Sequence, residues 1–182
     1  MINIGDFNTL RAKRFTQHGW YLACTEDEEV LLPQKYVPED FKENDLLEVF
    51  VYKDSEDRIV ATTETPYAIV GEFSYLEVKD VSKVGAFMDW GLEKDLLVPF
   101  REQKKTLEVG SKAIVFVYLD EQTGRIAASC KVDKFIEPID EEYKEEEEVD
   151  LLIYRKTDLG YEAIIDDQAV GFIYDSEIHQ TL

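Results

Sequence analysis

The chain has 182 residues and a net charge of −20, with 45% hydrophobic and 12% aromatic residues. This length allows one medium domain or two to three small ones, and the aromatic content favours β structure. So large a negative charge excludes indiscriminate binding to polyanions or anionic membranes, because the summed field repels them; otherwise it serves solubility. No apolar run approaches the ~20 residues of a membrane helix, and the first residues carry no apolar signal segment, so we expect a cytoplasmic protein with no membrane partner.

Turn residues divide the first third of the chain into five short predicted strands. The turns fall at Gly19, 27–29 and 54–57, while 33–45 lack strand alternation and predict a short helical turn and a loop. The strands are Phe7–Phe15, Trp20–Cys24, Val30–Leu32, Leu46–Lys53 and Arg58–Thr63. Five short antiparallel strands in about 65 residues are typical of a small closed barrel of the OB type, with an SH3-like barrel as the alternative.

The same pattern returns 66 residues later. VFVYKDSEDRIVATTE (49–64) is echoed by VFVYLDEQTGRIAASCK (115–131), with one residue inserted in the turn. The shift also superposes Gly5, Phe7, Leu10, Lys13, Gly19, Leu31 and Pro33 on Gly71, Phe73, Leu76, Lys79, Gly85, Leu97 and Pro99. Agreement over 60 residues predicts a tandem repeat of one module.

A partial third copy follows the two complete ones. Gly160 takes the place of Gly19 and Gly85, and GFIY (171–174) takes that of VLLP and LLVP, but the chain stops before the Val-Phe-Val-Tyr phrase. We therefore expect a mainly β protein of tandem five-stranded OB barrels. The first module spans 1–65 and the second 66–136, an acidic linker covers 137–145, and the partial third module covers 146–182. The early stop also suggests a piece, or a shortened relative, of a longer protein.

Alternation along the second strand of each copy separates a core face from an outer face. Asp89 should not be buried unpaired, so its face is the outer one, and it carries Phe87 in the second copy and Tyr21 in the first. The core face would carry Trp20, Leu22 and Cys24, matched by Ala86, Met88 and Trp90. By the same argument the outer face of the first strand carries Thr9, Arg11 and Lys13, matched by Tyr75, Glu77 and Lys79.

Each module thus pairs an outward aromatic with a lysine on the neighbouring strand. Single-stranded nucleic acids are bound in this way, because bases stack on aromatic rings while cations hold the phosphates. The alternative is that Tyr21 and Phe87 pack under a loop or against the adjacent module.

The second module resembles the RNA-binding OB domain of ribosomal protein S-one. The resemblance rests on GAF (85–87), LVPFRE (97–102) and RIAAS (125–129), which follow the family's order and spacing. The succession of copies, with GFIYDSEI in the third, resembles the conserved virulence factor B family. That family is regarded as RNA-binding and regulatory in bacteria, and its OB domains are followed by a winged helix, which would be a missing C-terminal region here.

The resemblance implies a nucleic-acid face at Phe87 and Arg125, and at Tyr21 and Arg58 in the first module. Departures from the family pattern accompany it. The family's aromatic residue before the glycine is replaced by His18 in the first copy and Val84 in the second. Its third-strand histidine is replaced by Pro33 and Pro99, and the third copy has Tyr174 there. The third copy also has Glu162 in the place of Phe87. These departures predict binding that is weaker than in a typical member, or partly lost.

Local charge favours the second module as the RNA-binding part. Residues 1–63 hold 7 basic and 13 acidic side chains (net −6), residues 64–135 hold 10 and 12 (net −2), and residues 136–182 hold 3 and 15 (net −12). The second module offers Lys79, Lys83, Lys94, Arg101, Lys104, Lys105 and Arg125. The acidic run 137–150 is either a solvated linker or a mimic of nucleic acid that occupies a basic face.

Signals for catalysis or for a bound cofactor are missing from the sequence. It has no phosphate-binding glycine loop, no GxSxG or HExxH motif, and only two histidines, in different copies. We therefore predict no enzyme, no cofactor and no metal site. The prediction is a regulator that binds single-stranded RNA weakly, mainly through the second module, at Phe87, Arg125, Lys79, Tyr75, Tyr21, Arg58, Lys13 and Arg11. The alternative is a protein-interaction scaffold that kept the barrels but lost nucleic-acid binding.

Overall fold

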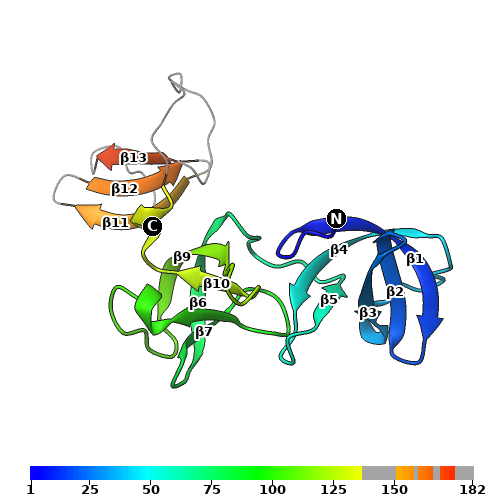
Figure 1. Cartoon of the computed structure of the whole chain (residues 1–182). Helices are drawn as coiled ribbons and strands as arrows, with labels where there is room; N and C mark the ends of the chain where they lie inside the picture. The colour runs from blue at the N-terminus through cyan, green and yellow to red at the C-terminus, as the bar shows by residue number, and fades with distance from the viewer. Residues whose placement is uncertain (137–150, 158–159, 166–168, 175–182) are drawn as a thin grey trace.

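The computed structural model describes residues 1–136, 151–157, 160–165 and 169–174, with side chains up to residue 136. Two closed five-stranded barrels lie side by side (Figure 1). The first consists of β1 (Phe7–Thr16), β2 (Gly19–Thr25), β3 (Glu28–Pro33), β4 (Leu46–Lys53) and β5 (Ile59–Thr62). A 3₁₀ turn, Gln34–Tyr36, follows β3, as expected for the segment without alternation. None of the described residues belongs to a helix long and apolar enough to cross a membrane.

The second barrel repeats the first. Its strands are β6 (Phe73–Val81), β7 (Gly85–Asp89), β8 (Leu96–Pro99), β9 (Lys112–Leu119) and β10 (Ile126–Ser129), with 3₁₀ turns at Phe100–Glu102 and Val132–Lys134. Both barrels have the same strand order, and each is closed by one parallel contact, Leu31 with Val60 and Leu97 with Ala127. The prediction of tandem OB-type barrels is confirmed.

A three-stranded antiparallel sheet of β11 (Leu151–Thr157), β12 (Gly160–Ile165) and β13 (Ala169–Tyr174) completes the described chain. It has the order of the first three strands of each barrel, and Gly160 pairs with Tyr174 as Gly19 pairs with Pro33. The acidic linker predicted at 137–145 lies outside the described residues.

A register irregularity recurs at one position of the repeat. It lies between Ala12 and Arg14 in the pairing of β1 with β2, between Val78 and Asp80 in β6, and between Ile153 and Arg155 in β11. A bulge of this kind leaves one residue unpaired and increases the local twist, which helps a short sheet to close into a barrel. Lys13 and Lys79 occupy the bulge position in the two barrels.

The core of each barrel follows the predicted alternation except at Cys24 and at Trp20, which is only partly buried against the core. Leu22, Met88 and Ala86 are fully buried, as expected for the inner face. Cys24 was expected beside them but is exposed, and Ala23 is buried instead. The reason is a register shift between Ala23 and Thr25 in the β2–β3 pairing, which ends the strict alternation one residue before Cys24.

Gly19 and Gly85 permit the closest backbone approach in each barrel. Both have positive φ, +139° and +151°, and a Cβ atom on either would overlap the carbonyl oxygen of the neighbouring strand, Leu32 or Val98. The glycine duplicated by the 66-residue repeat is therefore required by sterics where β2 meets β3 and β7 meets β8.

Strand β4 is buried on both faces and joins the two barrels. Val49 and Val51 point into the first barrel, whereas Phe50 and Tyr52 belong to the hydrophobic cluster of the second. Phe50 is 0% exposed and meets Trp90 edge to face, with ring centroids 5.6 Å apart. The hydrophobic cluster of the second barrel is therefore shared with the first, which contributes Phe50, Tyr52 and Val60 to it.

We expect Gly85→Ala to unfold the second barrel at a markedly lower temperature than the wild type. The matched control is Gly71→Ala, where φ is also positive (+96°) but nothing lies within 4 Å of the added Cβ. Positive φ alone costs an alanine about 1–2 kcal/mol, so the loss in Gly85→Ala should exceed this amount. Thermal and urea unfolding measure both variants, and equal losses would contradict the overlap with Val98.

Candidate nucleic-acid interface

The outer face of the first barrel places Tyr21 at its centre. Tyr21 on β2 pairs in register with Leu31 on β3, and Leu31 pairs with Val60 on β5. The ring of Tyr21 is partly exposed, and the guanidinium carbon of Arg14 lies 4.0 Å from its centroid. Arg14 is also held by Glu29, 3.2 Å away. An aromatic ring and a cation therefore lie together on this face, the pair that stacking and phosphate binding require.

The cation next to Tyr21 is Arg14 and not Lys13, the lysine that alternation predicted. Arg14 is the register partner of Tyr21 because Lys13 occupies the bulge. Lys13 is half-buried rather than fully outward. A bulge leaves no mark in the pattern of apolar and polar residues, so Arg14 could not be predicted from that pattern. The signal that the sequence does carry is its position near the end of β1, two residues before Thr16.

Phe87 holds the equivalent place in the second barrel. It is partly exposed, opposite the buried Met88, and pairs with Leu97 on β8. Its partner on β6 is Asp80, so a carboxylate stands where the first barrel has a guanidinium. Lys79 lies at the bulge, with its Nζ 3.6 Å from the carboxylate of Asp95.

Two of the predicted residues lie farther along their strands than the sequence analysis implied. Tyr75 is 57% exposed but pairs with Ile114 of β9, five residues before the position opposite Phe87. Arg11 is exposed and donates a hydrogen bond to the carbonyl oxygen of Asn44, 3.0 Å away. At about 3.3 Å per residue, Tyr75 is roughly 16 Å from the Phe87 position, so the two rings do not form one stacking site.

The other two predicted arginines, Arg125 and Arg58, are engaged with carboxylates. Arg125 donates two hydrogen bonds to Asp57 of the first barrel, at 2.7 and 2.6 Å, and this hydrogen-bonded pair lowers the pKa of Asp57. Arg58 donates to Asp54 at 2.9 Å and contacts Glu56 at 3.0 Å. The bidentate contact of Arg125 is the geometry in which arginine binds carboxylates and phosphates most strongly. A phosphate at Arg125 would have to share it with Asp57.

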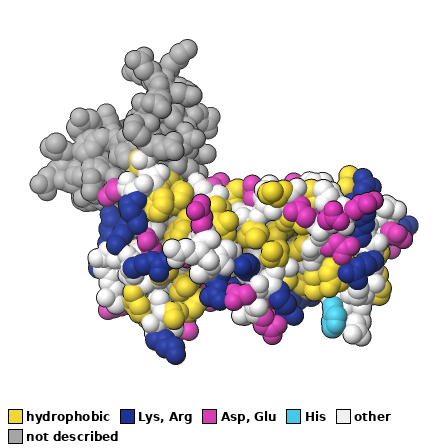
Figure 2. All heavy atoms as spheres, viewed as in Figure 1, with side chains coloured by type: hydrophobic (Ala, Val, Ile, Leu, Met, Phe, Trp, Pro, Cys, Tyr) yellow, Lys and Arg dark blue, Asp and Glu magenta, His cyan; other side chains and the backbone are white. Residues whose placement is uncertain are grey.

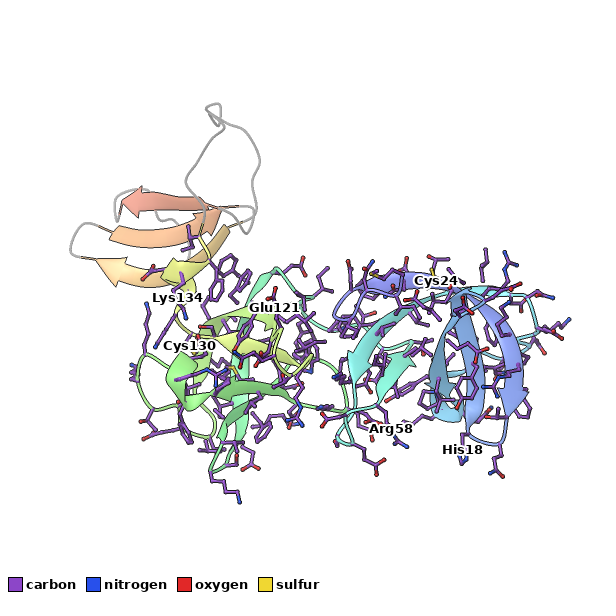
Figure 3. The ribbon with its side chains drawn as sticks, viewed as in Figure 1. His18, Cys24, Arg58, Glu121, Cys130 and Lys134 are labelled. Carbon is purple, nitrogen blue, oxygen red and sulfur yellow. The ribbon has the colours of Figure 1, made fainter. Side chains whose placement is uncertain are left out.

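Lys94 connects the loop after β7 to the turn after β4. Its Nζ donates hydrogen bonds to the carbonyl oxygens of Lys53 and Asp54, each 2.9 Å away. Burial lowers the pKa of Lys94, and the neighbouring Arg125 lowers it further. Figure 3 shows Arg58 at the end of the β4–β5 hairpin that approaches the second barrel. Arg58, Arg125 and Lys94 thus all lie where the two barrels meet.

The visible surface is mixed in charge. Figure 2 shows hydrophobic side chains grouped on the first barrel, and lysines and arginines interspersed with acidic residues along the second barrel and the junction. Within the described part of the chain, no three His, Cys, Asp or Glu side chains gather in a way that could hold a metal ion.

The bridge between Asp57 and Arg125 should make the stability of the junction depend on pH. Because the pKa of Asp57 is lowered in the folded protein, the stabilisation is complete above the ordinary aspartate pKa of about 3.9 and is lost as the pH falls through the lower folded value. Asp57→Asn should therefore melt below the wild type at pH 7, and the difference should shrink towards pH 3. Glu121→Gln, in the neighbouring turn, is the control without this bridge; a pH-independent difference for Asp57→Asn would contradict the assignment.

Both barrels are similar to a known family of domains. The family model of the S1 domain matches residues 4–64 and 70–131. Among curated proteins, the chain is 30% identical over 177 residues to the uncharacterized protein YitL of Bacillus subtilis, covering 93% of this chain and 59% of that protein. It is 26% identical over 183 residues to conserved virulence factor B of Staphylococcus epidermidis, covering 96% and 61%. The chain thus spans about three fifths of the length of these relatives.

A solved structure has the same fold. It is a crystal structure of a multidomain protein with nucleic acid binding domains from Streptococcus pneumoniae, superposed with a TM-score of 0.60 at 17% sequence identity. The match covers 97% of this chain and 64% of that one.

Proposed function

This chain belongs to the S1 domain family, and on that premise we propose that it binds single-stranded RNA through its two barrels and acts as a cytoplasmic regulator in bacteria. The observation that carries the proposal is the duplication of a partly exposed aromatic, Tyr21 or Phe87, on the outer face of the second strand of each barrel. The S1 domain family and the nucleic acid binding domains named for the Streptococcus pneumoniae structure support nucleic-acid binding.

The first barrel contributes a stacking position in this proposal. A base that stacks on Tyr21 gains about 1–3 kcal/mol, and Arg14, which lies over the same ring, can turn to a phosphate at the cost of its exposed contact with Glu29. Leu31, the partly exposed register partner of Tyr21 on β3, extends this face.

The second barrel contributes most of the positive charge that the proposed RNA binding uses. Its module has a net charge of only −2, compared with −6 and −12 for the flanking parts of the chain, so phosphates are repelled least here. Phe87 is its stacking position, and Lys79 and Arg125 are the nearest predicted cations. Because Asp95 and Asp57 compete for these cations, we expect weak binding. A scaffold that binds only proteins is not favoured by the comparisons.

Phe87→Ala and Met88→Ala should have opposite effects. Phe87→Ala should weaken RNA binding by ~1–3 kcal/mol, the value of one stacked base, and should cost less stability than the ~3–5 kcal/mol of a fully buried phenylalanine. Met88→Ala removes a fully buried side chain, so it should lower the melting temperature strongly but leave the affinity of the folded protein nearly unchanged. Calorimetric melting and fluorescence anisotropy with short RNAs, at a temperature where both variants are folded, measure the two effects.

The dependence of affinity on salt should be shallow. If two to four phosphates are neutralised, the slope of log K against log [salt] for single strands is about −1.5 to −3. Anisotropy titrations between low and moderate salt give this slope. A slope near zero with measurable affinity would indicate stacking alone, and no binding at low salt would favour the protein scaffold.

A further inference from the structure

The junction of the two barrels contains a pocket of about 340 Å³. One wall comes from β3, the 3₁₀ turn, β4 and β5 of the first barrel, and the other from the loop after β7 of the second. Its lining consists of Leu31, Pro33, Lys35, Tyr36, Tyr52, Asp54, Ser55, Arg58, Val60, Glu93 and Lys94. A volume near 300 Å³ is at the small end of ligand pockets and fits a ligand about as large as one nucleotide.

The pocket continues the outer face of the first barrel. Leu31, which lines it, is the register partner of Tyr21 on β2 and of Val60 on β5. Arg58, the residue just before β5, also lines the pocket. A strand of RNA that stacks one base on Tyr21 and continues over Leu31 therefore reaches the pocket without leaving the protein surface.

The chemistry of the lining suits a base with its phosphate. Leu31, Pro33, Val60 and the rings of Tyr36 and Tyr52 provide apolar and aromatic walls. Tyr52 is 7% exposed and stacks on Phe50, so it is held rigidly by the shared core. Aromatic walls of fixed orientation favour the flat face of a nucleobase.

The charge of the pocket is opposite to that of the chain. Three cations, Lys35, Arg58 and Lys94, line it against two carboxylates, Asp54 and Glu93, a balance of +1 in a chain of net charge −20. Lys35 forms an ion pair with Glu93, which also accepts a hydrogen bond from the hydroxyl of Tyr36 at 2.9 Å. Both contacts are exposed, so an anion can replace them at little cost in free energy.

From these observations we propose that the junction pocket is a nucleotide subsite, which takes one base of the bound RNA against the partly exposed ring of Tyr36, with its phosphate at Arg58 or Lys35. The inference rests on the proposed RNA binding but assigns it a place that neither barrel forms alone. It also gives the rigid junction a function, because the pocket exists only while Glu93 and Lys94 are held against the first barrel.

The test uses the full chain and a single-stranded RNA that carries 4-thiouridine at one position at a time. Irradiation followed by peptide mapping should give an adduct at Tyr36 for one position of the strand. Tyr36→Ala should weaken RNA binding about 5- to 100-fold, the range for one lost stacked base, and should abolish this adduct. Tyr36→Phe keeps the ring and loses only the hydroxyl contact with Glu93, so its affinity should stay within about threefold of the wild type.

The outcomes separate the subsite from the proposed function. RNA binding that depends on Tyr21, with adducts at Tyr21 but none in the pocket and unchanged affinity in Tyr36→Ala, would overturn the subsite alone. No RNA binding by the wild type would overturn both. An equal loss in Tyr36→Phe and Tyr36→Ala would also overturn the subsite, because the ring would then not be the binding element. If AMP or UMP bound the pocket as tightly as the oligomer, independently of Tyr21, the pocket would be a receptor for free nucleotides and not part of the RNA path.

Discussion

The burial of β4 on both faces determines the rest of this structure. Val49 and Val51 close the first barrel, while Phe50 and Tyr52, on the opposite face, pack into the core of the second against Trp90. A strand with two buried faces cannot separate from either barrel without exposing apolar surface, at about 25 cal/mol per Å². The two modules are therefore a single body, and the loop after β7 is brought against the β4–β5 hairpin as a consequence.

This fixed junction explains how a protein of net charge −20 uses its cations. In the second barrel, Arg125 binds Asp57 of the first barrel although its side chain is exposed, and the partly buried Lys94 binds the backbone carbonyls of 53 and 54. These contacts orient the barrels and place both cations where the two barrels meet. In the proposed RNA binding, attraction of a polyanion then depends on how these cations are arranged locally, because the summed field of the chain is repulsive.

The repeat shows how one module design acquires different surfaces. The bulge at Lys13 and Lys79 and the close approach at Gly19 and Gly85 are retained, because barrel closure requires them. The residues that face the central aromatic are not retained: Tyr21 is opposite Arg14, Phe87 is opposite Asp80, and the pairing in the third sheet joins Arg155 to Glu162. Backbone geometry is thus preserved across the copies while the chemistry of the outer face changes from one to the next.

The sequence by itself determined the repeat, the five strands of each barrel and the inward position of Leu22 and Met88, because these follow from local periodicity and from glycine positions that sterics restrict. It also indicated Tyr21 and Phe87, on an outer face marked by Asp89. Only the tertiary structure decided that Arg14 and not Lys13 lies over Tyr21, that Cys24 is exposed, and that Arg125 binds Asp57. A bulge moves side chains without changing composition, and a contact between residues 68 positions apart depends on how two finished barrels pack.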